Sequence, residues 1–142
     1  MTRGVGITCD DTPERGGSMP EQSVIRDAVA SYLKAVATGS AADVAALYAE
    51  DATLEDPVGS EPVRGRAAIT EFYSTLENMR QDVELLALRV AGDSAAFHFR
   101  VRTELPDGAA EIEPIDVMTF DEAGRITTMR AFWSPEDVHL AQ

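Results

Sequence analysis

The stretch EPIDVMTF, Glu113 to Phe120, has the pattern of a β-strand with one acidic residue on its apolar side. Side chains alternate between the two faces of a strand, so residues two apart share a face. Counting by twos gives one mostly apolar face, formed by Ile112, Pro114, Asp116, Met118 and Phe120. The opposite face carries Glu111, Glu113, Ile115, Val117 and Thr119. We therefore expect Asp116 to point toward the interior of the protein.

An aspartate in that position has two possible explanations. Burying an ionised carboxylate is unfavourable, so the group is expected to raise its pKa and become neutral. Staying mostly protonated at pH 7 costs roughly 4 kcal/mol or more relative to a solvated aspartate. A protonated aspartic acid can donate a hydrogen bond to a developing oxyanion. The alternative is a structural aspartate that pairs with a buried arginine or accepts backbone N–H groups, and the strand pattern leaves both explanations open.

Two neighbouring strands provide apolar faces that can surround Asp116. In the strand predicted over Ala95 to Leu105, one face consists of Phe97, Phe99, Val101 and Leu105. In the last strand, over Arg125 to Trp133, the apolar face consists of Met129, Ala131 and Trp133. If these faces converge, Asp116 lies in an apolar environment.

The order of the predicted elements indicates an α+β fold. A first helix ends near Ala37, Ser40 caps a second helix that includes Val44, Leu47 and Tyr48, and a third helix lies near 66–76. After a short strand over 52–56, period-two alternation predicts strands near 83–90, 95–105, 109–120 and 125–133. Helices followed by an antiparallel meander predict about three helices packed on one face of a curved antiparallel sheet, which can enclose an apolar pocket.

Length and composition limit the domain organisation and the classes of partner. Residues 1–18 lack apolar periodicity and are expected to be a disordered tail before one domain over 19–142. The net charge of −13 argues against nucleic acid and against anionic membrane surfaces, and a neutral ligand fits it best. No stretch has the roughly 20 apolar residues of a membrane span, and no secretory signal is evident, so we expect a cytoplasmic protein.

Metal and disulfide chemistry are not indicated by the sequence. Cys9 is the single cysteine, so no internal disulfide can form. No clustered His/Cys pattern suggests zinc, and His98 and His139 are far apart beside polar neighbours, which predicts surface positions.

Two further residues are candidates for chemistry. Asp56, in LEDPVG, ends a strand, and the proline after it favours an extended conformation. A plain turn carboxylate is the alternative. Tyr32 lies on the inner face of the first helix, where most aromatic residues are simply core, although a buried hydroxyl needs a hydrogen-bond partner. None of the three candidates is a specific signal alone.

Together, these residues resemble a known family. The segment YLKAVATGSAADVAALYAEDATLEDPVGSEPVRGRAAITEFY, from Tyr32 to Tyr73, resembles the first half of the bacterial Δ5-3-ketosteroid isomerases. EPID matches that family's penultimate strand, and MRAFW followed by SPEDVH resembles its C-terminal strand and exit. The resemblance spans roughly 23–139.

The resemblance implies a cone-shaped α+β domain of the nuclear-transport-factor-like type and a homodimer packed through its sheet. It places the oxyanion-hole tyrosine at Tyr32, the catalytic base at Asp56 and a protonated aspartic acid at Asp116. Ketosteroid isomerase is itself a standard example of a carboxylic acid held neutral at pH 7, so this role for Asp116 follows from the resemblance. The tyrosines that support Tyr32 by hydrogen bonding fall on Tyr48 and Tyr73.

The implied substrate is a small apolar steroid, isomerised from the 3-oxo-Δ5 form to the conjugated 3-oxo-Δ4 form without a metal or an organic cofactor. The resemblance places a steroid-facing aromatic at Trp133. We expect the substrate to contact the inward faces described above, through Phe99, Val101, Ile112, Met118, Met129, Ala131 and Trp133.

Three other functions remain possible because one fold can carry many activities. A polyketide cyclase of the same fold can retain an acid and a tyrosine. Epoxide hydrolases of this fold use an Asp–Arg–Asp arrangement, and we expect no arginine on an inward face between Asp56 and Asp116. A non-catalytic protein that binds apolar ligands would have a solvated or ion-paired Asp116.

Overall fold

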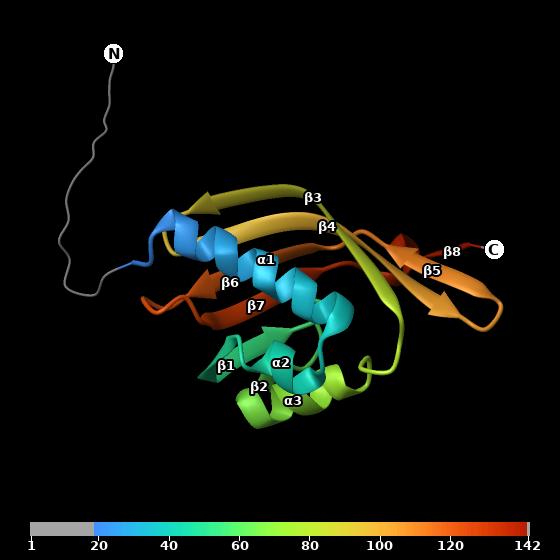
Figure 1. Cartoon of the computed structure of the whole chain (residues 1–142), viewed down its shortest axis with the longest axis horizontal. Coiled ribbons are helices and arrows are strands. Elements are labelled where there is room, and N and C mark those ends of the chain that lie inside the picture. Colours follow the sequence, from blue (N-terminus) through green and yellow to red (C-terminus); the bar gives the residue numbers. More distant parts are fainter. Residues whose placement is uncertain (1–18, 142) are drawn as a thin grey trace, which may run out of the picture.

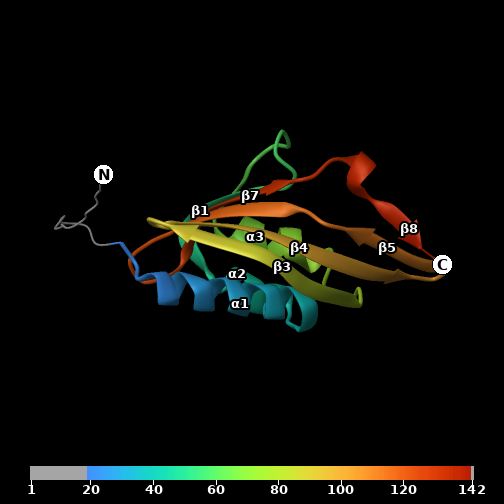
Figure 2. The same ribbon diagram turned by 90° about the horizontal axis from the view of Figure 1, so that it is seen from above.

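Three helices lie on one face of a curved sheet in the computed structural model, which describes residues 19–141 (Figures 1 and 2). They are α1 (Gln22–Thr38), α2 (Ala41–Ala45) and α3 (Arg66–Ser74). The predicted α+β class is confirmed. The tail predicted over 1–18 lies outside the described residues. No helix within 19–141 is long and apolar enough to cross a membrane.

The sheet has eight strands, in the order β2-β1-β7-β6-β4-β5-β8, with β3 paired to β4. Their bounds are β1 (Tyr48–Glu55), β2 (Val63–Arg64), β3 (Gln81–Ala91), β4 (Ser94–Leu105), β5 (Gly108–Ile112), β6 (Ile115–Phe120), β7 (Ile126–Phe132) and β8 (His139–Ala141). The 3₁₀ turn η2 (Pro135–Asp137) separates β7 from β8. The two shortest strands, β2 and β8, were not predicted.

The prediction of an entirely antiparallel sheet was wrong. β1 runs parallel to β7, so the sheet is mixed, while the other pairs are antiparallel. The strand pattern of 52–56 indicated a strand but not its partner, because β1 comes before α3 and its residues pair with residues of β7 about 75 positions later. This pairing carries the end of β1, where Asp56 follows, next to the end of β7, where Trp133 follows.

The second helix is shorter than predicted. Ser40 is its N-cap, as predicted, and forms a capping box with Asp43. The helix stops at Ala45, and Tyr48 already belongs to β1. From this point the backbone forms β-sheet hydrogen bonds in place of helical ones. The N–H of Ile126 donates to the carbonyl of Leu47 (3.0 Å), and Tyr48 pairs with Ile126.

The strand predicted over 109–120 is two strands, β5 and β6, separated by Glu113 and Pro114. Pro114 has no N–H to donate and interrupts the ladder. β4 is long enough to pair with both: Val101 pairs with Ile112 of β5, and His98 pairs with Ile115 of β6. Buried and exposed positions continue to alternate across the break between the two strands. Ile115 is exposed, whereas the buried residues are Pro114, Asp116, Met118 and Phe120.

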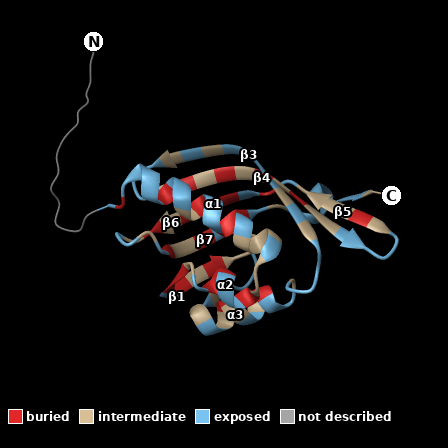
Figure 3. Cartoon of the chain, in the orientation of Figure 1, coloured by how far each residue is buried: buried red, intermediate tan, exposed pale blue. Residues whose placement is uncertain are grey.

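The core lies between the three helices and the inner face of β1, β4, β6 and β7 (Figure 3). The helix contributes Ile25, Val29, Tyr32 and Leu33. Leu105, predicted on the same inner face as Phe97, is instead exposed (41%). It lies at the far end of the β4–β5 hairpin, which extends beyond the helices and has no cover there (Figure 1).

Candidate active site

A cavity of about 240 Å³ lies between the helices and the inner face of the sheet. It brings together Tyr32, Asp56 and Asp116, which are far apart in the sequence. Five of the predicted substrate contacts also line it: Phe99, Val101, Ile112, Ala131 and Trp133. Most of the remaining wall is apolar, which suits an apolar ligand.

Two predicted contacts, Met118 and Met129, do not line the cavity. Both are fully buried in the core (0% and 1% exposed) and pair with each other across β6 and β7. Asp116 pairs with Ala131 on the same face, two residues nearer the cavity. The alternation therefore placed the methionines on the correct face, but it could not show that the cavity ends before them.

The cavity also has lining residues that were not predicted as contacts: Val36, Leu76, Gln81, Thr103, Ala110, Glu111, Pro114 and Val138. Alternation could have indicated Thr103, which follows Phe99 and Val101 on one face. Gln81 was missed because the predicted strand began at Val83, two residues after the true start of β3.

Asp116 is a buried acid on the central strand β6. Its side chain is 2% exposed, and its neighbours across the sheet are Phe97 on β4 and Ala131 on β7. Within the described residues, its Oδ1 has no hydrogen-bond partner. Burial raises its pKa well above the ordinary value, and the negative charge of Asp56 raises it further, while Tyr32 partly offsets this. Burial therefore favours the neutral, protonated form of Asp116 over the carboxylate.

Asp56 is less buried and has a donor. It directly follows β1, before a cis peptide bond to Pro57. The indole N–H of Trp133 donates to its Oδ1 (2.6 Å). Burial raises the pKa of Asp56, and the Trp133 hydrogen bond opposes that rise. The carboxyl group is therefore accessible from the cavity and has a partner that favours its ionised form.

Three tyrosines form a buried hydrogen-bonded chain that runs from the cavity wall into the core. The hydroxyl of Tyr73 shares hydrogen bonds with those of Tyr32 (3.2 Å) and Tyr48 (2.7 Å). Burial raises the pKa of all three well above the ordinary value, so they remain phenols at neutral pH. Tyr32 faces the cavity and contacts the edge of Phe97 (ring centroids 6.2 Å apart), whereas Tyr48 does not line the cavity.

No arginine or lysine is present among the described residues that line the cavity. The arginines of β4 lie on the other face of the sheet, where Arg100 bonds Glu84 and Glu113, and Arg102 bonds Glu111. The Asp–Arg–Asp arrangement is therefore not formed around this cavity. Residues 19–141 also contain no group of three or more His, Cys, Asp or Glu side chains placed to hold a metal ion.

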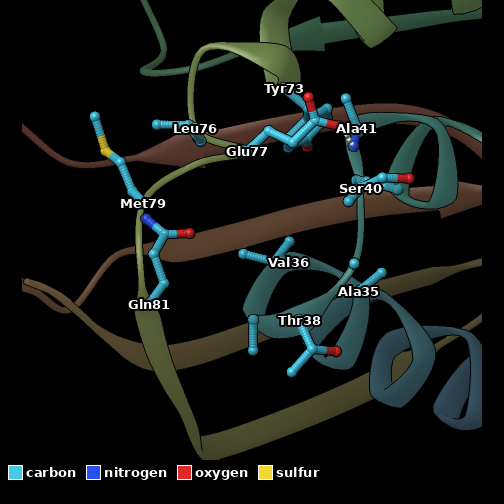
Figure 4. A pocket seen from close by; sticks show the side chains of 13 residues that line it. Ala35, Val36, Thr38, Ser40, Ala41, Tyr73, Leu76, Glu77, Met79 and Gln81 are labelled. Atoms are coloured by element: carbon cyan, nitrogen blue, oxygen red, sulfur yellow. Dashed lines mark hydrogen bonds between the residues drawn. The ribbon is translucent and has the colours of Figure 1, made fainter.

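Figure 4 shows a second, smaller cavity, of about 70 Å³. The two share the residues Val36, Tyr73, Leu76 and Gln81. Its other side is formed by the turn between α1 and α2, where the carboxylate of Glu77 accepts a hydrogen bond from the N–H of Ala41 (2.8 Å). This bond occupies the first N–H of α2 and links the start of that helix to the segment that follows α3.

The chain is similar in sequence to a known protein family and to named enzymes. A family model described as a SnoaL-like domain matches residues 29–129. A protein of Nocardioides simplex named Steroid Delta-isomerase is 60% identical over 114 residues, which cover 80% of this chain and 93% of that protein. A segment of 51 residues is 43% identical to Epoxide hydrolase LasB of Streptomyces lasalocidi, covering 36% of this chain and 18% of that protein.

Solved structures have the same fold. The epoxide hydrolase/cyclase-like enzyme SalBIII, described in pyran ring formation in the polyether salinomycin, aligns with a TM-score of 0.80 and 28% identity over 86% of this chain and 99% of its own. RV0760c of Mycobacterium tuberculosis aligns with a TM-score of 0.78 and 22% identity over 87% of this chain and 100% of its own. At that identity, the second structure bears on the fold alone.

Proposed function

The chain belongs to the SnoaL-like domain family, and we propose that it is a steroid Δ-isomerase that converts 3-oxo-Δ5-steroids to conjugated 3-oxo-Δ4-steroids. The observation that carries the proposal is the pairing of two unlike carboxyl groups in one apolar cavity. Asp116 is buried, and its Oδ1 has no hydrogen-bond partner among residues 19–141, while Asp56 accepts the Trp133 indole N–H. Two acids whose environments separate their pKa values suit a hydrogen-bond donor and a proton acceptor. The 60% identity to a protein named Steroid Delta-isomerase supports the same reaction.

The first step is removal of a proton from C4 of the substrate. The Asp56 carboxylate takes the proton, and the electron pair of the broken C4–H bond forms a C3–C4 double bond. The C3 carbonyl oxygen then carries the negative charge of a dienolate. Asp56 thereby becomes a carboxylic acid that retains the proton inside the cavity.

Tyr32 and the neutral Asp116 donate hydrogen bonds to that oxygen. Each donor of this kind is worth roughly 3 kcal/mol of transition-state stabilisation in other oxyanion holes. The chain from Tyr73 to Tyr48 holds the Tyr32 hydroxyl in place. Ionising Asp116 would cancel its contribution, so the burial that keeps its pKa high is part of the mechanism.

In the second step Asp56 returns the proton to C6. The C3 carbonyl re-forms, the double bond moves to C4–C5, and Asp56 is again a carboxylate. The proton that left the substrate is regained, so the reaction needs no net exchange with solvent and no added cofactor. The apolar wall formed by Phe99, Val101, Ile112, Ala131 and Trp133 holds the ring system.

A cyclase or epoxide hydrolase is the second candidate, because a segment resembles LasB and the whole domain resembles SalBIII. The absence of a cationic side chain from the described cavity lining weakens the epoxide hydrolase alternative. A non-catalytic binding protein is less consistent with a buried acid whose Oδ1 has no partner among the described residues.

The proposal is tested by adding 5-androstene-3,17-dione to the purified protein and following the ultraviolet absorbance of the conjugated enone. We expect catalytic conversion at low enzyme concentration. A folded protein that gives no conversion above background would rule out the isomerase, and the cavity would then belong to another substrate. Ligand chemistry gives an independent check, since a neutral acid beside Tyr32 should favour a steroidal phenol over its deoxy analogue, whereas a generic apolar pocket would not.

A further inference from the structure

The cavity has a second polar pair, well away from the catalytic groups. Gln81, the first residue of β3, pairs with Thr103 of β4, and both line the cavity. The Gln81 side-chain N–H donates to the Thr103 hydroxyl oxygen (3.1 Å). Both residues are half-buried, and apolar residues line the cavity around them, including Val36, Leu76, Val101 and Ala110.

The position of this pair along β4 sets its distance from the reacting groups. Asp116 pairs with Phe97, and Thr103 lies six residues further along the same strand on the same face. At about 3.3 Å per residue, this corresponds to a separation of roughly 20 Å. This length follows the backbone of a curved strand, so the direct span is shorter, and allowing about 3 Å for a hydrogen bond at each end leaves at most roughly 14 Å for a ligand. A rigid ligand with fused rings and an oxygen at each end fits that description.

The pair has unused hydrogen-bonding capacity. Within residues 19–141, the only hydrogen bond of either side chain is the one between them. Thr103 can still donate its O–H, and Gln81 retains a carbonyl acceptor and a second N–H. The third polar residue at this end, Glu111, is already paired with Arg102 (2.7 Å) on the other face. Covering Gln81 and Thr103 with apolar ligand surface would leave these polar groups unpaired, which is unfavourable.

We propose that Gln81 and Thr103 form a subsite that recognises an oxygen substituent on the steroid at the end opposite its 3-ketone. The inference rests on the proposed function and narrows its substrate class to steroids with a carbonyl or hydroxyl at C17. The Thr103 O–H and the free Gln81 N–H donate to that oxygen. The pair acts on selection of the substrate and takes no part in the proton transfer at C4 and C6.

The test compares two ligands that differ only at C17, 4-androstene-3,17-dione and 4-androsten-3-one. Both already have the conjugated enone, so binding is measured without turnover, through the fluorescence of Trp133, the single tryptophan, which lines the cavity. The measured quantity is the Kd of the deoxy ligand divided by that of the 17-oxo ligand. We expect Thr103→Val and Gln81→Met each to lower this ratio by roughly 3- to 10-fold.

Thr119→Val is the matched control. Thr119 bonds Thr127 and Thr128 and does not line the cavity, so this variant should keep the wild-type ratio. The same ratio in the wild type, Thr103→Val and Gln81→Met would overturn the subsite, even for an active isomerase. A ratio that falls as expected in a protein without isomerase activity would support the subsite and reject the proposed function. Failure of both ligands to bind would overturn both.

Discussion

Asp56 and Asp116 are the same type of side chain in two environments. Asp116 is almost completely buried, and Asp56 is partly exposed and accepts the Trp133 indole N–H. Burial raises the pKa of both, and the negative charge of Asp56 adds to the rise at Asp116. The charge of an ionised Asp56 thus favours the neutral form of Asp116, which is the combination that the proposed mechanism requires.

The pH dependence of activity follows from Asp56. It must be ionised to accept the C4 proton, so kcat/KM should fall as the pH drops through its raised pKa, above the usual aspartate value near 3.9. Trp133→Phe removes the hydrogen bond that lowers this pKa, so the midpoint of the acid limb should move to higher pH. Profiles of kcat/KM against pH for both proteins measure the shift. A midpoint that stays in place or moves to lower pH would show that Trp133 does not control the base.

Asp116 should lower the stability of the protein at neutral pH. Its folded pKa is raised, so between the unfolded and folded pKa values the folded state binds more protons than the unfolded state. The free energy of unfolding therefore decreases as pH rises through that interval, by up to about 1.4 kcal/mol per pH unit. Asp116→Asn removes this dependence, so its stability relative to the wild type should increase from pH 5 to pH 8. Urea unfolding at both values measures this difference, and a difference that does not change with pH contradicts a buried neutral acid.

At the residue scale, alternation alone placed Asp116 on the buried face. It could not determine how far along that face the cavity extends. Met118 and Met129 share the face but lie in the core, whereas Thr103 and Gln81 line the cavity. How far the cavity extends along a strand depends on which helix covers that strand. This is decided by tertiary packing and not by local sequence.

At the element scale, Arg66 connects α3 to β1. Its Nη2 and Nε donate to the carbonyl of Tyr48 (2.6 and 3.2 Å), next to the register shift between Tyr48 and Thr53 in the β1–β7 pairing. The Tyr48 hydroxyl bonds Tyr73, which belongs to the same helix as Arg66. The two contacts align the strand and helix that hold the tyrosine chain.

Arg66→Met should therefore lower the free energy of unfolding by roughly 1.5–3 kcal/mol, the range for hydrogen bonds to charged groups. Arg64→Met is the matched control, because Arg64 is exposed on β2 two residues away. Chemical denaturation of the two variants measures the difference. Equal and small effects in both would show that the Tyr48 carbonyl does not need Arg66.

Element prediction failed where long-range pairing decided the outcome. The Ser40 cap and the third helix have local signals and were predicted. The helix α2 ends earlier than predicted, because the chain is already hydrogen-bonded to β7 at Leu47. The parallel β1–β7 pair and the short strand β8 depend on partners distant in the sequence. The strand β2 pairs with the nearby β1, but with two residues it is too short to show alternation. The periodicity of a short segment does not indicate which other strand it will pair with.

At the scale of the whole molecule, the outer face of the sheet exposes an apolar pair. Ile115 and Phe132 pair across β6 and β7 and are 46% and 42% exposed. Arg130 lies over the Phe132 ring (5.3 Å), and His98 pairs with Ile115 from β4. An apolar centre bordered by polar residues is typical of a protein interface, and we propose that it is the centre of a homodimer packed through the sheet.

We expect the wild-type protein to sediment as a dimer and Ile115→Glu to sediment as a monomer, since the variant would place a charge in the centre of each copy's apolar patch. Leu140→Glu is the control, because Leu140 is 79% exposed on β8 and lies outside the patch. Sedimentation velocity distinguishes the species. A wild-type monomer, or a dimer that persists in Ile115→Glu, would contradict an interface at this face.

The central claim is that Asp56 moves the proton, and the most direct measurement of it is the turnover of 5-androstene-3,17-dione by the wild type and by Asp56→Asn. An amide keeps the shape of the side chain but cannot accept the C4 proton, so kcat should fall by roughly 10²- to 10⁴-fold, the usual contribution of a general base. Circular dichroism would show that the variant is folded. Rapid formation of the conjugated enone by the wild type and its loss in the variant is the predicted result. A folded Asp56→Asn protein with turnover within a few-fold of the wild type would contradict the account.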